Sequence, residues 1–362
     1  MANTTFVATG DILTTRSLGP FADAEEDTYK SLTRLLRGAD ITFGNLEVCL
    51  TRGGYPAEKL VNLRADPGLA EELAALGFDL VSIANNHTMD FGFDGLEETI
   101  SSLDKAGVPT VGGGRDIHQA RKPVTLQCNG NRFTHLGFSS CLPIGAEAGV
   151  TRPGIAPIRV TTSYEIDPAT LLEQPGTVPV VRTTLSETDL LAVEQAIKRA
   201  KEESEFVIIG MHWGVAYQEL LAEYQRTLAH AMVDVGADLI IGHHPHVPHG
   251  VEVYKGKTIF YSLGNFVMQY KRSAELSALL ASIGINMDTT KEEGGETFIV
   301  GATFDENGAI ETHVIPIVID QRGFPRCAEE AAANRIIAKI NRLSEGMARV
   351  ALQDGVGMIA AF

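Results

Sequence analysis

The sequence predicts an α/β protein built on largely parallel strands. Short apolar runs alternate with amphipathic helical segments along most of the 362 residues, and this alternation is typical of right-handed βαβ units. Several of the apolar runs end at polar motifs that contain Asp, Asn or His. Because the carboxyl ends of parallel strands share one edge of a sheet, these motifs are expected to meet there.

The composition is that of an ordinary globular protein, with 44% hydrophobic and 21% charged residues. The length suits one large domain, and we predict a single domain over residues 1–362. A formal net charge of -16 excludes the basic surface expected of a nucleic-acid-binding protein. The first residues form no export signal, no apolar run reaches the ~18 residues that span a bilayer, and the four cysteines form no CxxC pair. We therefore expect a cytoplasmic protein with reduced, mostly buried thiols and no membrane or nucleic-acid partner.

The first half of the chain supplies three steps of strand, polar loop and helix. Each predicted strand runs directly into a polar motif, and glycines stop two of the helices. The strands are predicted at 6–9, 40–43 and 78–83, the motifs at Gly10-Asp11, Gly44-Asn45-Leu46-Glu47 and Asn85-Asn86-His87, and the helices at 27–36, 67–76 and 95–106.

The second half repeats the pattern around an insertion at 142–186. The insertion is rich in Pro, Gly and Thr and lacks a helical period, which indicates an ordered, irregular lid or substrate wall. C-terminal to it, predicted strands end at His212 and at the histidine loop that begins with Gly242. Two hairpins are expected from their turn residues, and the second of them makes up 297–362 together with a helix. The remaining predicted elements are strands at 133–138, 206–210 and 237–241, helices at 187–200, 219–235 and 329–348, hairpins at 251–262 and 297–319, and a short cap at 276–285.

The histidine loop, Gly242-His243-His244-Pro245-His246, is the most informative motif. Pro245 fixes φ and stiffens the turn that directs the imidazoles. Together with the other polar motifs, the loop offers carboxylate, amide and imidazole groups without thiolates, which favours Mn²⁺, Zn²⁺ or Fe²⁺ over a structural cysteine-type zinc site. The ligands suffice for two ions about 3.5–4 Å apart.

At these motifs the sequence resembles the CapA-like family (capsule or poly-γ-glutamate synthesis) of the calcineurin-like metallophosphoesterases. The resemblance implies a four-layer α/β/β/α sandwich with metals at the sheet edges. It is carried by Gly44-Asn45-Leu46-Glu47, Asn85-Asn86-His87 with Asp90, His212-Trp213-Gly214, Gly242-His243-His244-Pro245-His246-Val247 and Ser262-Leu263-Gly264-Asn265-Phe266.

The resemblance also implies a ligand set for one or two ions. Asp11 and His246 would hold the first metal, and Asn86, His212 and His244 the second. The bridging position falls at Asn45 or at Glu47. The wider superfamily has Asp-x-His and Gly-Asp in the first two motifs, whereas this chain has Leu13 and Asn45. These departures weaken the first site.

His87 and Asp11 are the expected catalytic residues. The superfamily pattern implies that His87 delivers a proton to the leaving group, and the alternative is a hydrogen bond to Asp90. Asn265 is expected to tie down the histidine loop.

Four further residues are candidates for substrate binding. Arg16, Lys59 and Arg64 would pair with a carboxylate or phosphate, unless they are solvated charges. Trp213 would form a substrate platform, unless it belongs to the core.

The function expected from these features is a metal-dependent hydrolase. A metal-bound hydroxide would attack an amide, ester or phosphoester of a small, carboxylate-rich or peptide-like substrate. Two alternatives remain open: a metal-dependent peptide epimerase that removes a Cα proton, and a non-catalytic metal-binding protein. Neither the substrate nor the oligomeric state follows from the sequence.

Overall fold

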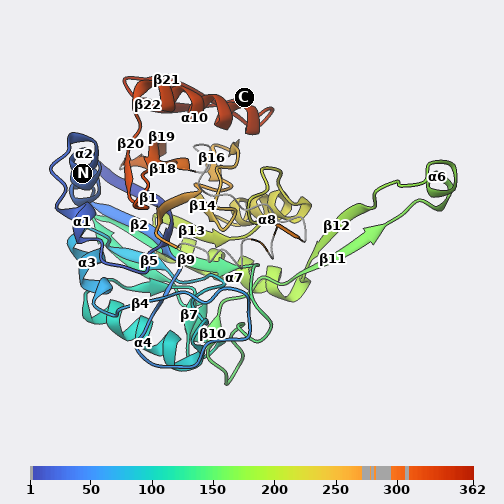
Figure 1. Ribbon diagram of the computed structural model, residues 1–362, viewed down its shortest axis with the longest axis horizontal. Coiled ribbons are helices and arrows are strands. Elements are labelled where there is room, and N and C mark those ends of the chain that lie inside the picture. Colours follow the sequence, from blue (N-terminus) through green and yellow to red (C-terminus); the bar gives the residue numbers. More distant parts are fainter. Residues whose placement is uncertain (1–2, 271–277, 279–280, 283–294, 306–309) are drawn as a thin grey trace.

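The computed structural model describes residues 3–270, 278, 281–282, 295–305 and 310–362 of the chain, which form two large sheets with flanking helices (Figure 1). Within this part, the first sheet has the order β21-β22-β19-β18-β1-β2-β5-β6, with β17 beside β1 and β20 beside β19. The second has the order β15-β16-β14-β13-β9-β8. The predicted α/β class is confirmed, and the strands that carry the polar motifs are divided between the two sheets.

The bounds of the elements follow the predicted runs closely. Strands of the first sheet are β1 (Thr4–Leu13), β2 (Ile41–Leu46), β5 (Leu80–Ser82), β6 (Thr110–Val111), β17 (Asn265–Met268), β18 (Glu296–Phe304), β19 (Ile310–Ile319), β20 (Pro325–Cys327), β21 (Ala348–Gln353) and β22 (Val356–Ala361). Strands of the second are β8 (Val124–Cys128), β9 (Asn131–Ser139), β13 (Phe206–His212), β14 (Leu239–His243), β15 (Val251–Tyr254) and β16 (Lys257–Phe260). The helices are α1 (Gly19–Ala22), α2 (Asp27–Gly38), α3 (Leu69–Ala75), α4 (Gly92–Lys105), α5 (Ile117–Ala120), α6 (Pro168–Glu173), α7 (Glu187–Glu203), α8 (Glu223–Asp234) and α10 (Glu330–Leu343).

Three clusters of buried apolar residues define the layers. One packs α2, α3 and α4 against the first sheet and includes Leu32, Leu73 and Leu96. A second lies between the two sheets, and a third packs α7 and α8 against the second sheet. The core residues therefore follow a helix, sheet, sheet, helix order, and burial of apolar area in three interfaces is the main stabilising contribution.

Strand register aligns the polar motifs. β1 pairs in parallel with β2 and β17, so that Asp11 lies opposite both Asn45 and Asn265. In the second sheet, β13 pairs in parallel with β14 and β9, which places His212 beside His243 and Ser139. Each sheet thus brings its own row of polar side chains to a carboxyl-terminal edge.

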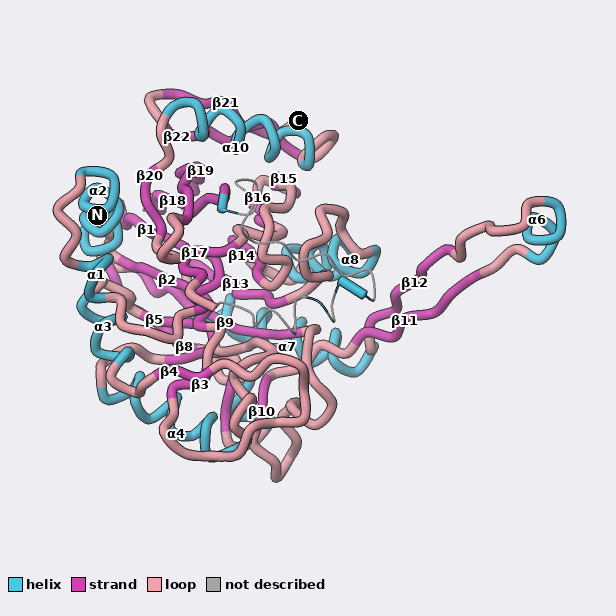
Figure 2. The backbone as a smooth tube through the Cα atoms, in the orientation of Figure 1, coloured by secondary structure: helices cyan, strands magenta, loops and turns pink. Residues whose placement is uncertain are grey.

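The insertion at 142–186 is less irregular than predicted. After the short β7 (Gly113–Gly114) and β10 (Gly154–Ile155) pair, β11 (Val160–Glu165) and β12 (Val180–Leu185) form an antiparallel arm with α6 at its tip. Figure 2 shows this arm projecting from the body of the protein. Both faces of β11 are largely exposed, so no apolar alternation marked it as a strand.

The C-terminal region also differs from the prediction. The last helix ends at Leu343, and β21 and β22 form a further hairpin that pairs with β19. The turn Asp354-Gly355 has positive φ at both residues, which is a hairpin signal that the prediction overlooked. The hairpin at 251–262 and the pairing of β18 with β19 are confirmed. The cap at 276–285 and the Asn307-Gly308 turn lie largely outside the described residues.

All four cysteines are free thiols, although only Cys49 is fully buried. A pair of short parallel strands, β3 (Cys49–Leu50) and β4 (Arg64–Ala65), lies in the loop region that follows β2. Among the helices that the structure describes, none has the length and apolar character required to cross a bilayer.

Candidate metal centre

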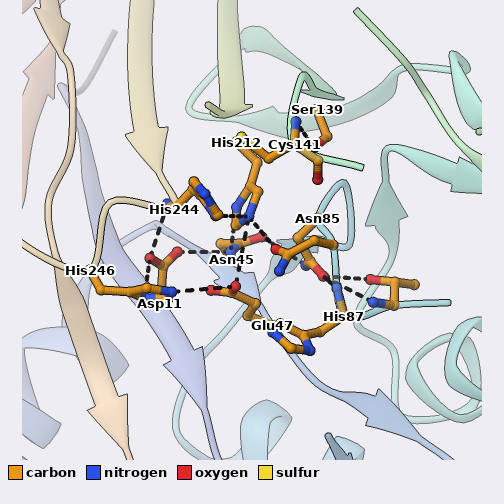
Figure 3. Close-up of polar contacts among 12 residues, drawn as sticks. Asp11, Asn45, Glu47, Asn85, His87, Ser139, Cys141, His212, His244 and His246 are labelled. Carbon is orange, nitrogen blue, oxygen red and sulfur yellow. Dashed lines mark hydrogen bonds and ion pairs between the residues drawn. The ribbon is translucent and has the colours of Figure 1, made fainter. Parts of the chain in front are cut away.

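Polar side chains from both sheets meet in one largely buried cluster (Figure 3). Asp11 and Asn45 come from β1 and β2, and Glu47 follows β2 by one residue. His212 ends β13, and His244 and His246 lie in the loop after β14. Strand ends far apart in sequence therefore converge, as the alternation of strands and helices predicted.

Two groups of possible metal ligands share Glu47. Asp11, Glu47 and His246 form one group, and Glu47, His212 and His244 form the other, with the ligand atoms of each group within 4.8 Å of one another. The Glu47 Oε1 atom lies 3.7 Å from His212 Nε2 and 3.8 Å from His246 Nε2. One carboxylate between two imidazole-containing groups suits a pair of divalent ions with a bridging ligand.

The Glu47 carboxylate itself has no hydrogen-bond partner in the described structure. Both of its oxygens are buried, and the side chain is 0% exposed. Burial raises the pKa of Glu47 well above its ordinary value, and the nearby Asp11 adds to this rise. A buried, unpartnered carboxylate is costly unless a cation binds it, so the residues present fit a metal centre.

The orientation of the Asn45 amide is fixed by a chain of hydrogen bonds. Asn85 Oδ1 accepts hydrogens from the His87 and Thr88 backbone nitrogens and from the Thr88 hydroxyl, so the Asn85 nitrogen must face the other way. It donates to Asn45 Oδ1 at 3.1 Å, and Asn45 Nδ2 in turn donates to Asp11 Oδ1 at 2.8 Å. The amide nitrogen of Asn45, which is not a metal-ligating atom, therefore faces the cluster.

The Asn86 amide lies beside the second group of possible ligands. His212 Nε2 lies 2.8 Å from Asn86 Oδ1 and 3.1 Å from His244 Nδ1. Burial lowers the pKa of His212 well below its ordinary value and lowers that of His244 to about 3. Both imidazoles are therefore neutral near pH 7, which is the form that ligates metals.

In the first group, Asn265 and Asp11 hold His246. Asn265 Oδ1 accepts the His246 Nδ1 hydrogen at 2.9 Å, and Asn265 Nδ2 donates to the His246 carbonyl at 3.3 Å. This arrangement leaves the His246 Nε2 atom on the side of Glu47. Burial by itself would lower the pKa of His246, but the Glu47 and Asp11 carboxylates raise it well above the ordinary value.

The histidine loop is held in an uncommon backbone conformation. His244 and His246 have φ values of 96° and 59°, in the region that non-glycine residues seldom adopt. The His244 backbone nitrogen donates to Asp11 Oδ2 at 3.1 Å, which ties the loop to the first sheet. Such backbone strain concentrates at functional sites because the surrounding structure must maintain it.

His87 forms a hydrogen-bonded pair with Asp90 at the edge of the cluster. His87 Nδ1 donates to Asp90 Oδ2 at 2.6 Å, while Lys59 Nζ donates to Asp90 Oδ1 and to the Asn86 carbonyl, both at 2.6 Å. Burial lowers the pKa of His87, against the opposing effect of Asp90. Within the described chain, His87 Nε2 has no hydrogen-bond partner, so it remains available to a ligand.

Three of the predicted substrate contacts do not reach the cluster. Trp213 is 0% exposed and donates its indole hydrogen to the Tyr261 carbonyl at 2.8 Å, so the prediction of a substrate platform was wrong. Arg16 is exposed and donates to the Arg322 carbonyl at 3.3 Å, and the Arg64 guanidinium lies over the Phe91 ring. Lys59 does lie beside the cluster, but Asp90 neutralises it.

Asn85 was not among the predicted site residues, although it links Asn45 to the His87 loop. The sequence contained a weak signal for it, since asparagine before a turn commonly accepts backbone hydrogens two and three residues later. The neighbouring Asn86 was predicted as the site residue instead, because its side-chain oxygen could bind a metal.

Comparisons with known proteins identify the family of the chain. Residues 5–270, which contain the whole cluster, match the family model described as bacterial capsule synthesis protein PGA_cap. The chain is 28% identical to the uncharacterized protein y4sH of Sinorhizobium fredii, over 98% of this chain and 92% of that protein. It is 31% identical to the PGA biosynthesis protein CapA of Bacillus subtilis, over 71% of this chain and 61% of that protein. A solved structure of a hypothetical protein from Thermus thermophilus has a TM-score of 0.46 and 17% identity, covering 87% of this chain and 99% of that one.

Proposed function

The chain belongs to the family of bacterial capsule synthesis proteins, and we propose that it is a metal-dependent hydrolase with two divalent ions in the cluster of strand ends. The observation that carries this proposal is Glu47, a buried carboxylate without a hydrogen-bond partner that is common to two groups of ligands. A purely structural cluster would satisfy these oxygens with protein donors.

Each ion would have its own ligand set. Asp11, Glu47 and His246 would hold the first ion, and Glu47, Asn86, His212 and His244 the second. Oxygen and imidazole donors without thiolates favour Mn²⁺, Fe²⁺ or Zn²⁺. Bound ions of this kind lower the pKa of water toward neutrality and polarise the group to be cleaved.

We propose Glu47, not Asn45, as the bridging ligand. The Asn45 amide donates to Asp11 and is locked in that orientation by Asn85. Its role would be to hold the Asp11 carboxylate in place for the first ion, as partners of metal ligands commonly do.

His87 would act on the leaving group. Its Nδ1 hydrogen is bound to Asp90, so a proton on Nε2 gives an imidazolium that the carboxylate stabilises. Donation of that proton would return His87 to the neutral form that its burial favours. Lys59 would limit the movement of Asp90 by binding its other oxygen.

The proposed substrates are amide-bonded and rich in carboxylates. One relative of the chain is called a PGA biosynthesis protein, and the proposed site would direct positive metal charge at an anionic substrate. The chain itself carries a formal net charge of -16, so such a substrate would need the metal ions to offset repulsion.

The first test is metal stoichiometry, measured by elemental analysis and Mn²⁺ titration calorimetry. We expect two ions per wild-type chain and a large loss in His212→Ala, whereas the exposed His118→Ala control should bind normally. Absence of metal binding at neutral pH would contradict the proposal and favour a non-catalytic protein.

The second test concerns the reaction. The Mn²⁺-loaded protein is incubated in D₂O with γ-glutamyl peptides and with bis(4-nitrophenyl) phosphate, and the products are followed by mass spectrometry. We expect cleavage, with a strong reduction in His87→Asn. Deuterium at a Cα position without cleavage would overturn the hydrolase and favour an epimerase.

A further inference from the structure

Tyr217 lies against the proposed first metal site, although nothing in the sequence pointed to it. Its ring centroid is 5.3 Å from that of His246, with the planes inclined by 37°. The side chain is half-buried, and its backbone nitrogen donates to the Pro245 carbonyl at 2.8 Å. Tyr217 is therefore part of the wall of the cluster on the His246 side.

The backbone at Tyr217 is unusual for its residue type. Its φ of 61° lies in the left-handed region, which bulky residues avoid because Cβ approaches the neighbouring carbonyl. The ring-contact partner His246 and the nearby His244 share this property. Three non-glycine residues around one cluster hold this conformation, which the surrounding structure must maintain.

The loop that carries Tyr217 is anchored on both sides of the residue. Besides the Pro245 contact, His249 Nε2 donates to the Gln218 carbonyl at 2.6 Å. Glu219 forms ion pairs with Lys339 and Arg342 of α10, both at 2.9 Å. The α10 helix lies outside residues 5–270, so a part of the chain beyond the matched family region helps to position this loop.

The Tyr217 hydroxyl has no hydrogen-bond partner in the described part of the chain. The cations that the sequence offered as substrate contacts are engaged elsewhere, since Lys59 binds Asp90 and Arg64 lies over Phe91. The Tyr217 hydroxyl beside His246 would supply a hydrogen-bond donor for an anionic ligand in their place.

We infer that Tyr217 is a ligand-contacting residue whose hydroxyl donates a hydrogen bond to an oxyanion, a phosphate or carboxylate group, bound beside His246. This inference rests on the proposed metal-dependent function, because the bound ions would attract the oxyanion to the cluster. Tyr217 would then orient the ligand without contributing charge.

The test compares Tyr217→Phe with the wild type by calorimetry, using Mn²⁺ alone and then inorganic phosphate with the Mn²⁺-loaded protein. A hydrogen bond to a charged group predicts a loss of phosphate affinity of about tenfold. Affinity for Mn²⁺ should stay within about twofold, because the aromatic ring of phenylalanine remains against His246. Tyr164→Phe, a change on the exposed arm, is the matched control and should leave both affinities unaltered.

Unchanged phosphate affinity in Tyr217→Phe, or an equal loss of Mn²⁺ affinity, would overturn the inference and leave the hydrolase proposal standing. A wild type that binds no Mn²⁺ would instead refute the proposed function, and the inference with it.

Discussion

The Glu47→Gln substitution has opposite expected effects on the metal-free and the metal-loaded protein. The change keeps the shape of the side chain and removes its negative charge. Without metal, the Glu47 oxygens are buried beside Asp11 and have no donor to satisfy them. Because burial and the neighbouring Asp11 disfavour the charged carboxylate, its replacement by a neutral amide should increase the free energy of unfolding by about 1–3 kcal/mol.

With metal, the same substitution should remove most of the stabilisation. Binding to the folded state alone adds about 2.7 kcal/mol per site when the free ion is at 100 times its dissociation constant. Glutamine removes the ligand that both groups share, and a loss of about 100-fold in affinity would reduce the gain at the same ion concentration to ~0.4 kcal/mol. The variant should therefore be the more stable protein in EDTA and the less stable one in Mn²⁺.

Urea unfolding of both proteins, in EDTA and at increasing Mn²⁺ concentration, measures this crossover. Glu252→Gln is the matched control, because Glu252 is also buried but binds Arg226, His230 and Tyr261. That control should lose stability equally with and without metal. If Glu47→Gln gains as much from Mn²⁺ as the wild type, Glu47 is not a shared ligand and the two-ion arrangement is refuted.

Three further predictions concern His135, Asn265 and the arm formed by β11 and β12. Burial lowers the pKa of His135 to about 3, whereas its pKa in the unfolded chain is near 6.5. The contribution of the neutral, buried His135 to the free energy of unfolding is therefore complete above pH 6.5 and decreases as the pH falls toward 3. The wild type should thus lose ~2 kcal/mol between pH 7 and pH 5 from this residue, and His135→Leu should lose correspondingly less in EDTA; an identical pH slope for both proteins would contradict the assignment. Asn265→Ala should weaken Mn²⁺ binding by about 10–100-fold because His246 loses its orienting partner, whereas Asn334→Ala on α10 should have no effect in the same titration. Residues 165–180 can be replaced by Asn-Gly, which closes the arm at the paired Tyr164 and Val181. This change should alter the melting temperature by less than about 2 °C, because the removed residues are almost all exposed. A loss of cooperative unfolding would show that the arm stabilises the rest of the protein.

The sequence predicted which strand ends would meet, because both the period of apolar residues and the polar residue that ends each run are local properties. Asp11, His212 and His246 could be brought together by this reasoning without knowledge of the packing. The division of the strands between two sheets did not follow from the apolar pattern, since a buried parallel strand has the same pattern in either sheet, and only the family resemblance implied it. Trp213 was misjudged for a related reason, because its burial depends on the neighbouring Tyr261 and not on its own position in the motif.

Other features of the site depend on conformations that residue types do not reveal. Tyrosine is not a turn residue, and nothing local indicates that Tyr217 adopts a left-handed backbone; the contacts of its loop with His249 and α10 impose it. Arg16 and Arg64 have the charge that a substrate contact requires, but the partners of such long side chains depend on where the loops lie in the folded protein.

The asparagine at position 45, where the sequence resemblance led us to expect aspartate, has a structural explanation in the neighbouring Glu47. Residues two apart on an extended segment project to the same face, so a carboxylate moved from position 45 to position 47 remains on the side of the cluster. The longer glutamate compensates for part of the displacement. An amide at position 45 then becomes useful, because it donates to Asp11 where a second carboxylate would repel it. A chain that restored aspartate at position 45 while keeping Glu47 would place three carboxylates around the first ion, and Asn45→Asp should therefore lower stability in EDTA and recover it only when metal is bound.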